Sequence, residues 1–162
     1  MTAPATDLDR IMAVMSAAFD PAFGEAWTRR QVEDALIAGN CHYLLIGPEI
    51  SETAAVAPVA GFCLSRYGVD EEELLLFAID PAYRQRGLGR TLLARFAEAA
   101  QARGARRLLL EMRKGNSAEH LYRTFGFFPV GERREYYRTP DGQCLDAITF
   151  VRDCEKLHLM KN

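Results

Sequence analysis

The chain has 162 residues, 49% hydrophobic and 26% charged, so we expect one globular domain with a sizeable core. Its formal net charge of −2 gives no overall case for nucleic-acid binding, and no direct nucleic-acid contact is expected. There is no apolar run of the roughly 20 residues that a membrane span needs, and the N-terminus does not resemble a secretory signal. These features predict a cytoplasmic protein with no membrane partner.

Cysteine and histidine usage argues against a metal centre. The cysteines are far apart in the sequence and form no Cys-x-x-Cys pair, and the histidines show no metal-ligand spacing. No metal is therefore expected. We predict reduced, buried thiols at Cys41, Cys63, Cys144 and Cys154.

The first third of the chain predicts two amphipathic helices. Apolar residues recur at helical spacing over 7–19, with Asp7 as the expected N-cap. The stretch 28–40 predicts a second helix, in which Thr28 and Gln31 form a capping box.

Strands and helices then alternate. Residues 41–46 read as a strand, 47–58 as a loop, and 59–67 and 72–79 as two strands, the second apolar on both faces like a central strand. Later, a helix from Leu88 to Gly104, a strand at 106–112 and a short helix at 117–125 precede a hairpin of 127–138 with 144–152. The order predicts an α/β (α+β) domain spanning 1–162, with a central mixed sheet of about six or seven strands, flanking helices and a tail at 153–162.

The sequence RQRGLGR, residues 84–90, lies at the junction between a predicted strand and a predicted helix. Unpaired N–H groups at a helix start, glycines that permit close approach and arginine donors together favour a seat for a phosphate group. A tight turn without a ligand remains open from these residues alone. A Rossmann fingerprint would need glycine at Leu92, and a P-loop would need Gly-Lys-Ser/Thr where Gly89-Arg90 stands.

The stretch from Ala78 to Leu93 resembles the acetyl-CoA-binding motif of the GNAT superfamily of N-acetyltransferases. Arg84, Gly87 and Gly89 occupy the defined positions of its Gln/Arg-x-x-Gly-x-Gly/Ala pattern. The resemblance implies a twisted mixed sheet in which a splayed pair of strands holds acetyl-CoA. It also implies that the loop binds the pyrophosphate while the preceding strand pairs with the pantetheine arm. The implied cofactor-binding residues are Phe77, Ala78, Ile79, Arg84, Gln85, Arg86, Gly87, Leu88, Gly89 and Arg90.

The chain from 108 to 150 is further similar to the RimI-type ribosomal-protein alanine N-acetyltransferases. They share a Leu-Glu-x-Arg strand, a Leu-Tyr-x-x-x-Gly-Phe helix end, an Arg-Arg-x-Tyr-Tyr segment and a late Asp-Ala. The matching positions are Glu111, Arg113, Tyr122, Gly126, Phe127, Arg133, Arg134, Tyr136, Tyr137, Asp146 and Ala147. The resemblance runs from about residue 8 to 152, but before Glu71 it is weak. Near Trp27, Ala26 and Thr28 replace the family's Pro and Ser.

Two of these residues suit acetyl transfer to an amine. The amine must lose a proton and the leaving thiolate must gain one. The resemblance implies that Glu111 is the general base and Tyr122 the general acid. For Glu111 the structural alternative is a strand-end carboxylate paired with Arg113 or with a helix terminus, and for Tyr122 it is a core tyrosine whose hydroxyl has found a partner.

Other predicted site residues have an alternative structural role. The resemblance assigns Asn116 to the cofactor, but it stands one position closer to Tyr122 than the family pattern requires, so it can instead cap the helix. Glu71 matches a family glutamate that would bind a cationic acceptor, although a solvated turn is the alternative. Arg134 and Tyr136 are the other predicted acceptor-side residues. Because side chains alternate along a strand, at most half of 133–137 can face the acceptor.

We therefore predict an acetyl-CoA-dependent N-acetyltransferase, with a protein N-terminal α-amino group, such as a ribosomal-protein alanine, as favoured acceptor. Acetylation of lysine or of a small amine is an alternative, since acceptor pockets diverge on shared folds. A non-catalytic acyl-CoA sensor is an alternative of another class. The protein is expected to be a monomer or a dimer.

Overall fold

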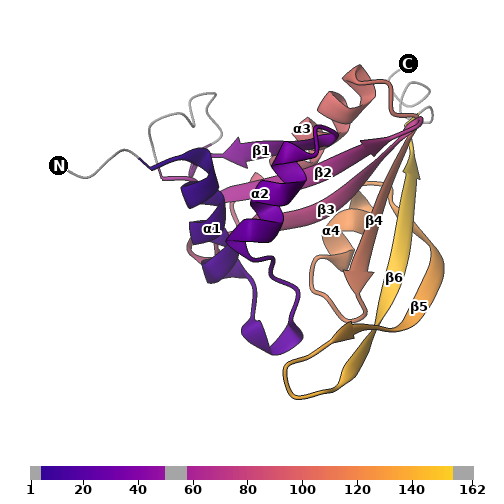
Figure 1. Cartoon of the computed structure of the whole chain (residues 1–162). Coiled ribbons are helices and arrows are strands. Elements are labelled where there is room, and N and C mark those ends of the chain that lie inside the picture. The colour runs from indigo at the N-terminus through magenta and orange to yellow at the C-terminus, as the bar shows by residue number, and fades with distance from the viewer. Residues whose placement is uncertain (1–4, 50–57, 155–162) are drawn as a thin grey trace.

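The computed structural model describes residues 5–49 and 58–154. Helices and strands follow one another in the order expected from the sequence (Figure 1). They are α1 (Asp7–Ala18), the 3-10 helix η1 (Pro21–Phe23), α2 (Arg29–Ile37), β1 (Cys41–Ile46), β2 (Gly61–Gly68), β3 (Glu71–Ile79), the 3-10 helix η2 (Pro81–Tyr83), α3 (Leu88–Ala102), β4 (Arg107–Arg113), α4 (Glu119–Thr124), β5 (Phe128–Arg138) and β6 (Cys144–Asp153). Most of the predicted loop at 47–58, and the tail beyond Cys154, lie outside the described residues.

The strands form one sheet with the order β1-β2-β3-β4-β6-β5. Every neighbouring pair is antiparallel except β3 and β4, which run parallel with α3 as the crossover. The expected mixed sheet with flanking helices is therefore confirmed, with six strands. β6 reaches Asp153, the first residue of the predicted tail, and Cys154 is buried.

Helices cover both faces of the sheet and create two cores (Figure 1). Ile11, Val14 and Met15 of α1 and Val32 of α2 pack on one face of β2 and β3. The apolar side of α3, with α4, packs on the other face and reaches β4 and β6. The central strand β3 contributes to both cores, as its two apolar faces predicted: Leu76 lies in the α1 core and Leu74 in the α3 core.

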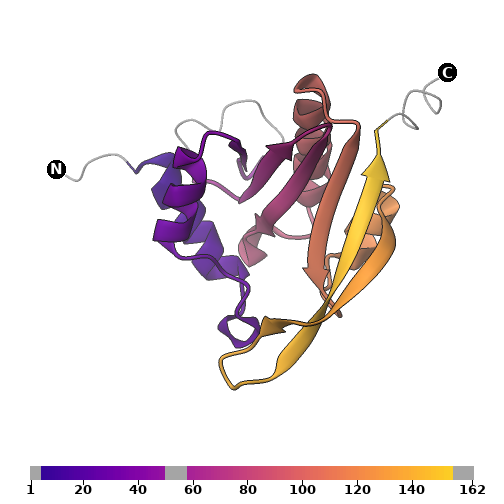
Figure 2. The same cartoon turned by 45° about the vertical axis from the view of Figure 1, so that its right-hand side comes forward.

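A β-bulge explains how residues two positions apart face opposite cores. β2 pairs Ser65 with Leu74 and Leu64 with Leu76, so Leu75 is an extra residue in β3. A bulge bends a strand and reverses the facing of the residues that follow. The parallel pairing of β3 with β4 ends at the same point, at Leu74 opposite Leu110. Beyond it, the two strands diverge, as Figure 2 shows, and leave an opening at their carboxyl ends.

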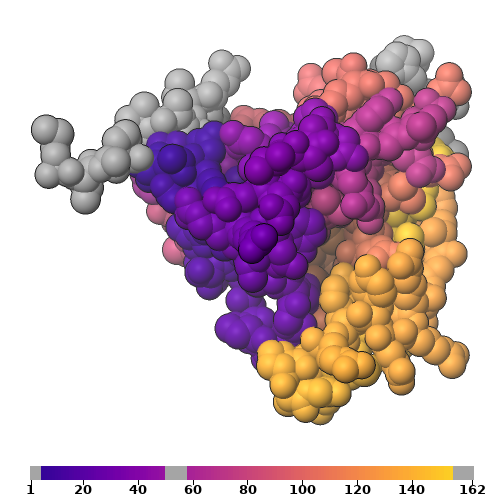
Figure 3. All heavy atoms as spheres, in the orientation of Figure 1, coloured from indigo at the N-terminus to yellow at the C-terminus, as the bar shows by residue number. Residues whose placement is uncertain are grey.

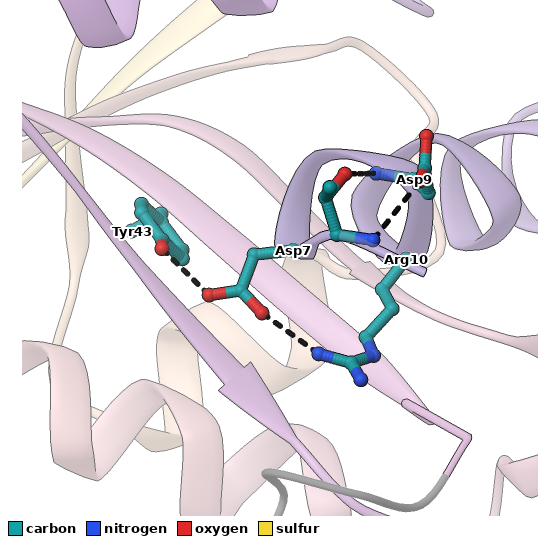
Figure 4. A network of polar contacts seen from close by, with 5 residues as sticks. Asp7, Asp9, Arg10 and Tyr43 are labelled. Atoms are coloured by element: carbon teal, nitrogen blue, oxygen red, sulfur yellow. Dashed lines mark hydrogen bonds and ion pairs between the residues drawn. The ribbon is translucent and has the colours of Figure 1, made fainter. Parts of the chain in front are cut away.

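Local capping fixes the N-terminal helices. The N-cap of α1 is Thr6, not the predicted Asp7: Thr6 and Asp9 form a capping box. Asp7 instead lies between Tyr43 of β1, whose hydroxyl donates to it at 2.7 Å, and Arg10 at 2.9 Å (Figure 4). The predicted capping box of Thr28 and Gln31 at α2 is confirmed.

A buried ion pair ties α3 to the central strand. Glu72 is fully buried, and both its oxygens accept from Arg103, at 2.8 and 2.7 Å. The acidic run at 71–73 is therefore not simply a solvated turn, because its middle carboxylate holds the C-terminal end of α3.

The cysteines correspond in part to expectation. The described residues contain no disulfide, and Cys63 and Cys154 are buried, but Cys41 is only partly buried and Cys144 is exposed. The prediction of a buried thiol was wrong for Cys144 because it opens β6 beside the hairpin turn. No helix among the described residues is long and apolar enough to cross a membrane.

Candidate active site

A cleft of about 550 Å³ occupies the opening between the ends of β3 and β4. Its walls come from the end of α1 and η1, the end of β3, the start of α3, the end of β4 and the start of α4. The sequence-predicted residues that line it are Phe77, Ala78, Ile79, Arg84, Gln85, Gly87, Leu88, Gly89, Arg90, Asn116 and Tyr122. Arg86 does not line the cleft.

The glycine-arginine loop presents free backbone donors to this cleft. Gln85 and Gly87 have left-handed φ values of 66° and 77°, and α3 begins directly afterwards. The backbone N–H groups of residues 85–90 donate to no acceptor among the described residues. Such a curved run of N–H groups at a helix N-terminus binds anions, and the donor set fits a pyrophosphate.

The loop arginines have different roles. Arg84 donates through Nε to the Ile79 carbonyl at 3.2 Å and through Nη2 to the Ala18 carbonyl at 3.4 Å, so it ties β3 to the end of α1. Arg86 lies over the Tyr83 ring. Arg90 lines the cleft and is therefore the arginine best placed to meet an anion beside the backbone donors.

The end of β3 offers a free strand edge to the cleft. Phe77, Ala78 and Ile79 pair with β2 on one side, while the side that would pair with β4 is open after Leu74. An extended amide-containing chain can hydrogen-bond such an edge. Gly89 lies close to this strand end, since a Cβ there would come within 3.8 Å of Ile79 Cγ1 and 3.9 Å of Phe77 Cε1.

Tyr122 projects from α4 into the cleft between two aromatic rings. Its ring makes edge contacts with Phe77 and Phe127, each at a centroid separation of 6.0 Å. Burial, together with the negative charge of Glu25, raises the pKa of Tyr122 well above its ordinary value. Tyr122 is a buried member of the α3 core that also lines the cleft, and its hydroxyl has no hydrogen-bond partner in the described part of the chain.

Glu111 lies on the face of β4 that the helices α3 and α4 do not cover. Its side chain is 14% exposed; Oε1 is 2.9 Å from Arg133 Nε and accepts from Thr149 Oγ1 at 3.3 Å. The alternative pairing with Arg113 was wrong, because Arg113 instead contacts Glu25 at 2.6 Å. Glu111 does not line the cleft itself, whereas Arg113, two residues further along the same face, does.

Asn116 is not the N-cap of α4, because the N-cap is Ala118 and no side chain caps this helix, so the predicted capping role was wrong, while its contact with the cofactor stays a prediction. Its side-chain Oδ1 accepts from the Ala118 N–H at 2.9 Å, which stabilises the turn before α4, and the residue also lines the cleft. The carboxamide oxygen is thus engaged locally.

The predicted acceptor-side residues lie apart from one another. Glu71 is at the opposite end of β3 from the cleft, 3.6 Å from Arg107, so the structure does not bring it together with Glu111. Arg134 is exposed, and Tyr136 is 49% exposed with its ring against Tyr137.

Tyr137 is the tyrosine of this segment nearest the site charges. Burial and the charges of Glu25 and Glu111 raise the pKa of Tyr137 to about 12. A bulge between Arg133 and Tyr137 of β5 breaks the simple alternation expected there.

Glu25 is the residue that the sequence did not indicate. It follows η1, lines the cleft, and its partner Arg113 lies 88 positions away in the sequence. No spacing pattern surrounds it, and the weak family resemblance of this segment gave no matching residue. The described residues contain no cluster of His, Cys, Asp and Glu side chains that could hold a metal ion.

Comparisons with known proteins agree with this geometry. The model of the acetyltransferase (GNAT) family matches residues 8–127. A ribosomal protein bS18-alanine N-acetyltransferase of Escherichia coli K12 is 41% identical over 91 residues, which cover 56% of this chain and 61% of the relative. The matched region thus spans about three fifths of that relative. A Bacillus subtilis 168 protein, provisionally given the same designation, is 32% identical over 144 residues, 88% of this chain and 86% of the relative.

Solved structures show the same fold. The crystal structure of the ribosomal-protein-S18-alanine N-acetyltransferase from Escherichia coli has a TM-score of 0.75 at 28% identity, covering 94% of this chain and 91% of that one. Arabidopsis thaliana NAA60 in complex with acetyl-CoA has a TM-score of 0.74 at 16% identity, covering 94% and 96%, and supports the fold alone. Because the family model matches residues 8–127, most of its length, the chain belongs to the acetyltransferase (GNAT) family.

Proposed function

We propose that the protein transfers the acetyl group of acetyl-CoA to the α-amino group of a protein N-terminus, with a ribosomal-protein alanine as the favoured acceptor. The observation that carries the proposal is the cleft itself, which is lined both by the loop with free backbone donors and by Tyr122. The similarity to bS18-alanine N-acetyltransferases supports the choice of acceptor.

Different segments of the cleft would bind different parts of acetyl-CoA. The N–H groups of 85–90, with Arg90, would hold the pyrophosphate, and the open edge at 77–79 would pair with the pantetheine amides. The thioester would then lie in the opening between β3 and β4, beside Tyr122.

The reaction requires three proton transfers. The acceptor ammonium gives a proton to Glu111, directly or through water, and its nitrogen then forms a bond to the thioester carbon. The carbon–sulfur bond breaks, and Tyr122 donates its proton to the departing thiolate. The acylated nitrogen then gives its second proton to the Tyr122 phenolate, directly or through water, which leaves a neutral amide and restores the phenol. The raised pKa of Tyr122 keeps the phenol protonated until that thiolate forms.

Mass spectrometry of peptides incubated with the purified protein and acetyl-CoA tests the proposal. We expect acetylation at the α-amine of peptides beginning with alanine. Transfer to lysine side chains, spermidine or an aminoglycoside but not to N-termini would contradict the proposed acceptor. Binding of acetyl-CoA without transfer to any amine would instead favour a sensor.

A further inference from the structure

The acceptor side of the cleft contains a largely buried ion pair outside the proposed catalytic pair. Glu25 Oε1 and Arg113 Nε are 2.6 Å apart, and both side chains are only 13% exposed. The Arg113 guanidinium lies 3.7 Å from the centre of the Phe23 ring, and its Nη1 donates to the Lys114 carbonyl. One partner comes from the segment after η1 and the other from the end of β4.

The backbone holds Glu25 in this position. Gly24 has φ 65°, and a Cβ there would come within 2.9 Å of the Arg138 carbonyl oxygen, so the segment packs directly against the end of β5. Figure 3 shows this purple segment against the yellow-orange β5–β6 hairpin at the lower edge of the molecule. Before it, the Asp20 side chain caps η1 by accepting from the Ala22 N–H. Glu25 is thus fixed from both sides.

Glu25 and Arg113 differ in which of their polar atoms remain available to an acceptor. Arg113 has one guanidinium face against Phe23 and its Nε and Nη1 engaged. Glu25 uses Oε1 alone, and its Oε2 has no partner among the residues that the structure describes. Glu111, the other carboxylate on this side, is partly neutralised by Arg133. The uncommitted carboxylate oxygen of Glu25 is therefore the group that an incoming acceptor would meet.

We propose that Glu25 is a specificity-determining residue of the acceptor site, which favours acceptors with a positive charge beside the reacting amine and disfavours those with a carboxylate there. The inference rests on the proposed transfer to an amine. Arg113 holds Glu25 in place and offsets part of its charge. A carboxylate that is only 13% exposed discriminates by charge because little water screens it.

The opposite charges of the pair give a test that a purely structural role cannot mimic. The two acceptors are peptides identical except for the second residue, Ala-Lys and Ala-Glu, and the readout is the ratio of their kcat/KM values. We expect the wild type to prefer Ala-Lys, Glu25→Gln to reduce the ratio about tenfold and Arg113→Gln to increase it. The change should lie in the acceptor KM, with the acetyl-CoA KM unaltered. Glu25→Asp should largely retain the preference.

Glu33→Gln is the matched control, since it removes the same charge from a half-exposed ion pair with Arg29 on α2. Equal kcat/KM values for the two peptides in the wild type would overturn the assignment without any variant. A shift in the same direction for Glu25→Gln and Arg113→Gln would show that the pair serves only the fold, and would also overturn it.

A second acceptor pair separates this inference from the proposed function. Cadaverine and 6-aminohexanoate are amines of similar length that end in an ammonium and a carboxylate. Transfer to these but not to peptides would refute the N-terminal acceptor, while the effect of Glu25→Gln on the cadaverine preference would still decide the role of Glu25. Transfer to neither pair would overturn both proposals.

Discussion

Glu111 is a carboxylate with two polar neighbours, Arg133 and Thr149, on the face of β4 that α3 and α4 do not cover. The substitution Glu111→Gln keeps the shape and the contact with Thr149 but removes the proton acceptor. We expect kcat to fall roughly 100-fold, most strongly at acidic to neutral pH, where the acceptor amine is protonated. The acetyl-CoA KM should stay within about twofold of the wild type, since the donor loop is untouched.

Steady-state kinetics across pH measure this effect. Glu132→Gln on β5, whose carboxylate pairs with Lys114, is the control for charge removal nearby. Full activity of Glu111→Gln would remove Glu111 from the mechanism.

Tyr122 offers a cleaner substitution, because its ring and its hydroxyl have separable roles. Tyr122→Phe retains the edge contacts with Phe77 and Phe127 and deletes a hydroxyl without a described partner. We expect the free energy of unfolding to change by less than about 1 kcal/mol, because no hydrogen bond is lost. The rate of acetyl transfer should fall at least roughly tenfold.

Urea unfolding and initial rates on the same samples test this pair of expectations. Tyr83→Phe removes another hydroxyl from the cleft wall and should leave the rate unchanged. A large loss of stability in Tyr122→Phe would mean that the hydroxyl is structural.

Single residues differ in how far sequence alone could place them. Glu111 and Tyr122 were identified through motif positions, and their local elements formed as expected. The residues that pair with Glu111 and Arg113 were not identified. The Glu25–Arg113 contact, for example, depends on where a loop 88 positions away in the sequence packs against the sheet. The spacing of residues in the sequence carries no information about where that loop packs.

At the scale of elements, the glycine-arginine loop was predictable because its chemistry is local: a strand end, two glycines and a helix start. The opening beside it was expected only from the family resemblance. The bulge at Leu75 that accompanies it lies inside an unbroken apolar run, where an extra residue leaves no mark in the sequence. The alternation expected at 133–137 failed for the same physical reason, a bulge in β5.

Gly87 tests whether the loop conformation matters for the donor. Its φ is 77°, and a Cβ there would meet no protein atom within 4 Å, so Gly87→Ala adds backbone strain and a methyl group facing open space. We expect about 1–2 kcal/mol of strain, relieved by a shift of the N–H groups. The acetyl-CoA KM should rise roughly tenfold with a smaller change in kcat.

Gly39 provides the matched control for strain. It has φ 85° and equally open surroundings, but it follows α2, and it does not line the cleft. Gly39→Ala should lower the melting temperature similarly and leave the acetyl-CoA KM unchanged. If the acetyl-CoA KM of the Gly87→Ala variant equalled that of the wild type, the loop would not bind acetyl-CoA.

At the scale of the whole molecule, the order of helices and strands was enough to predict the fold class. A parallel pair of strands needs a crossover connection, and α3 is that connection between β3 and β4. The insertion of β6 between β4 and β5 was not derivable, because the hairpin alone fits the sheet edge in either orientation. That order places β5 at the edge and brings Tyr137 within reach of the charges of Glu25 and Glu111.

Titratable groups buried in the fold predict how its stability depends on pH. Burial raises the pKa of Cys63 from its ordinary value of 9.0 to about 12, and the pKa of Tyr137 from 10.0 to about 12. Because both folded-state values exceed the unfolded ones, their stabilising effect is complete below about pH 9 and is lost as the pH rises towards 12. Cys63 alone gives a slope of up to about 1.4 kcal/mol per pH unit in that window.

Urea unfolding between pH 8 and 11.5 measures this loss. We expect the free energy of unfolding to be nearly constant up to about pH 9 and to fall steadily above it. Cys63→Ala should be less stable at pH 8 but have a flatter profile above pH 9, because only the thiol that titrates is removed. Cys144→Ala, at an exposed position, should retain the wild-type slope. Parallel profiles for Cys63→Ala and the wild type would mean that the Cys63 thiol does not control alkaline stability.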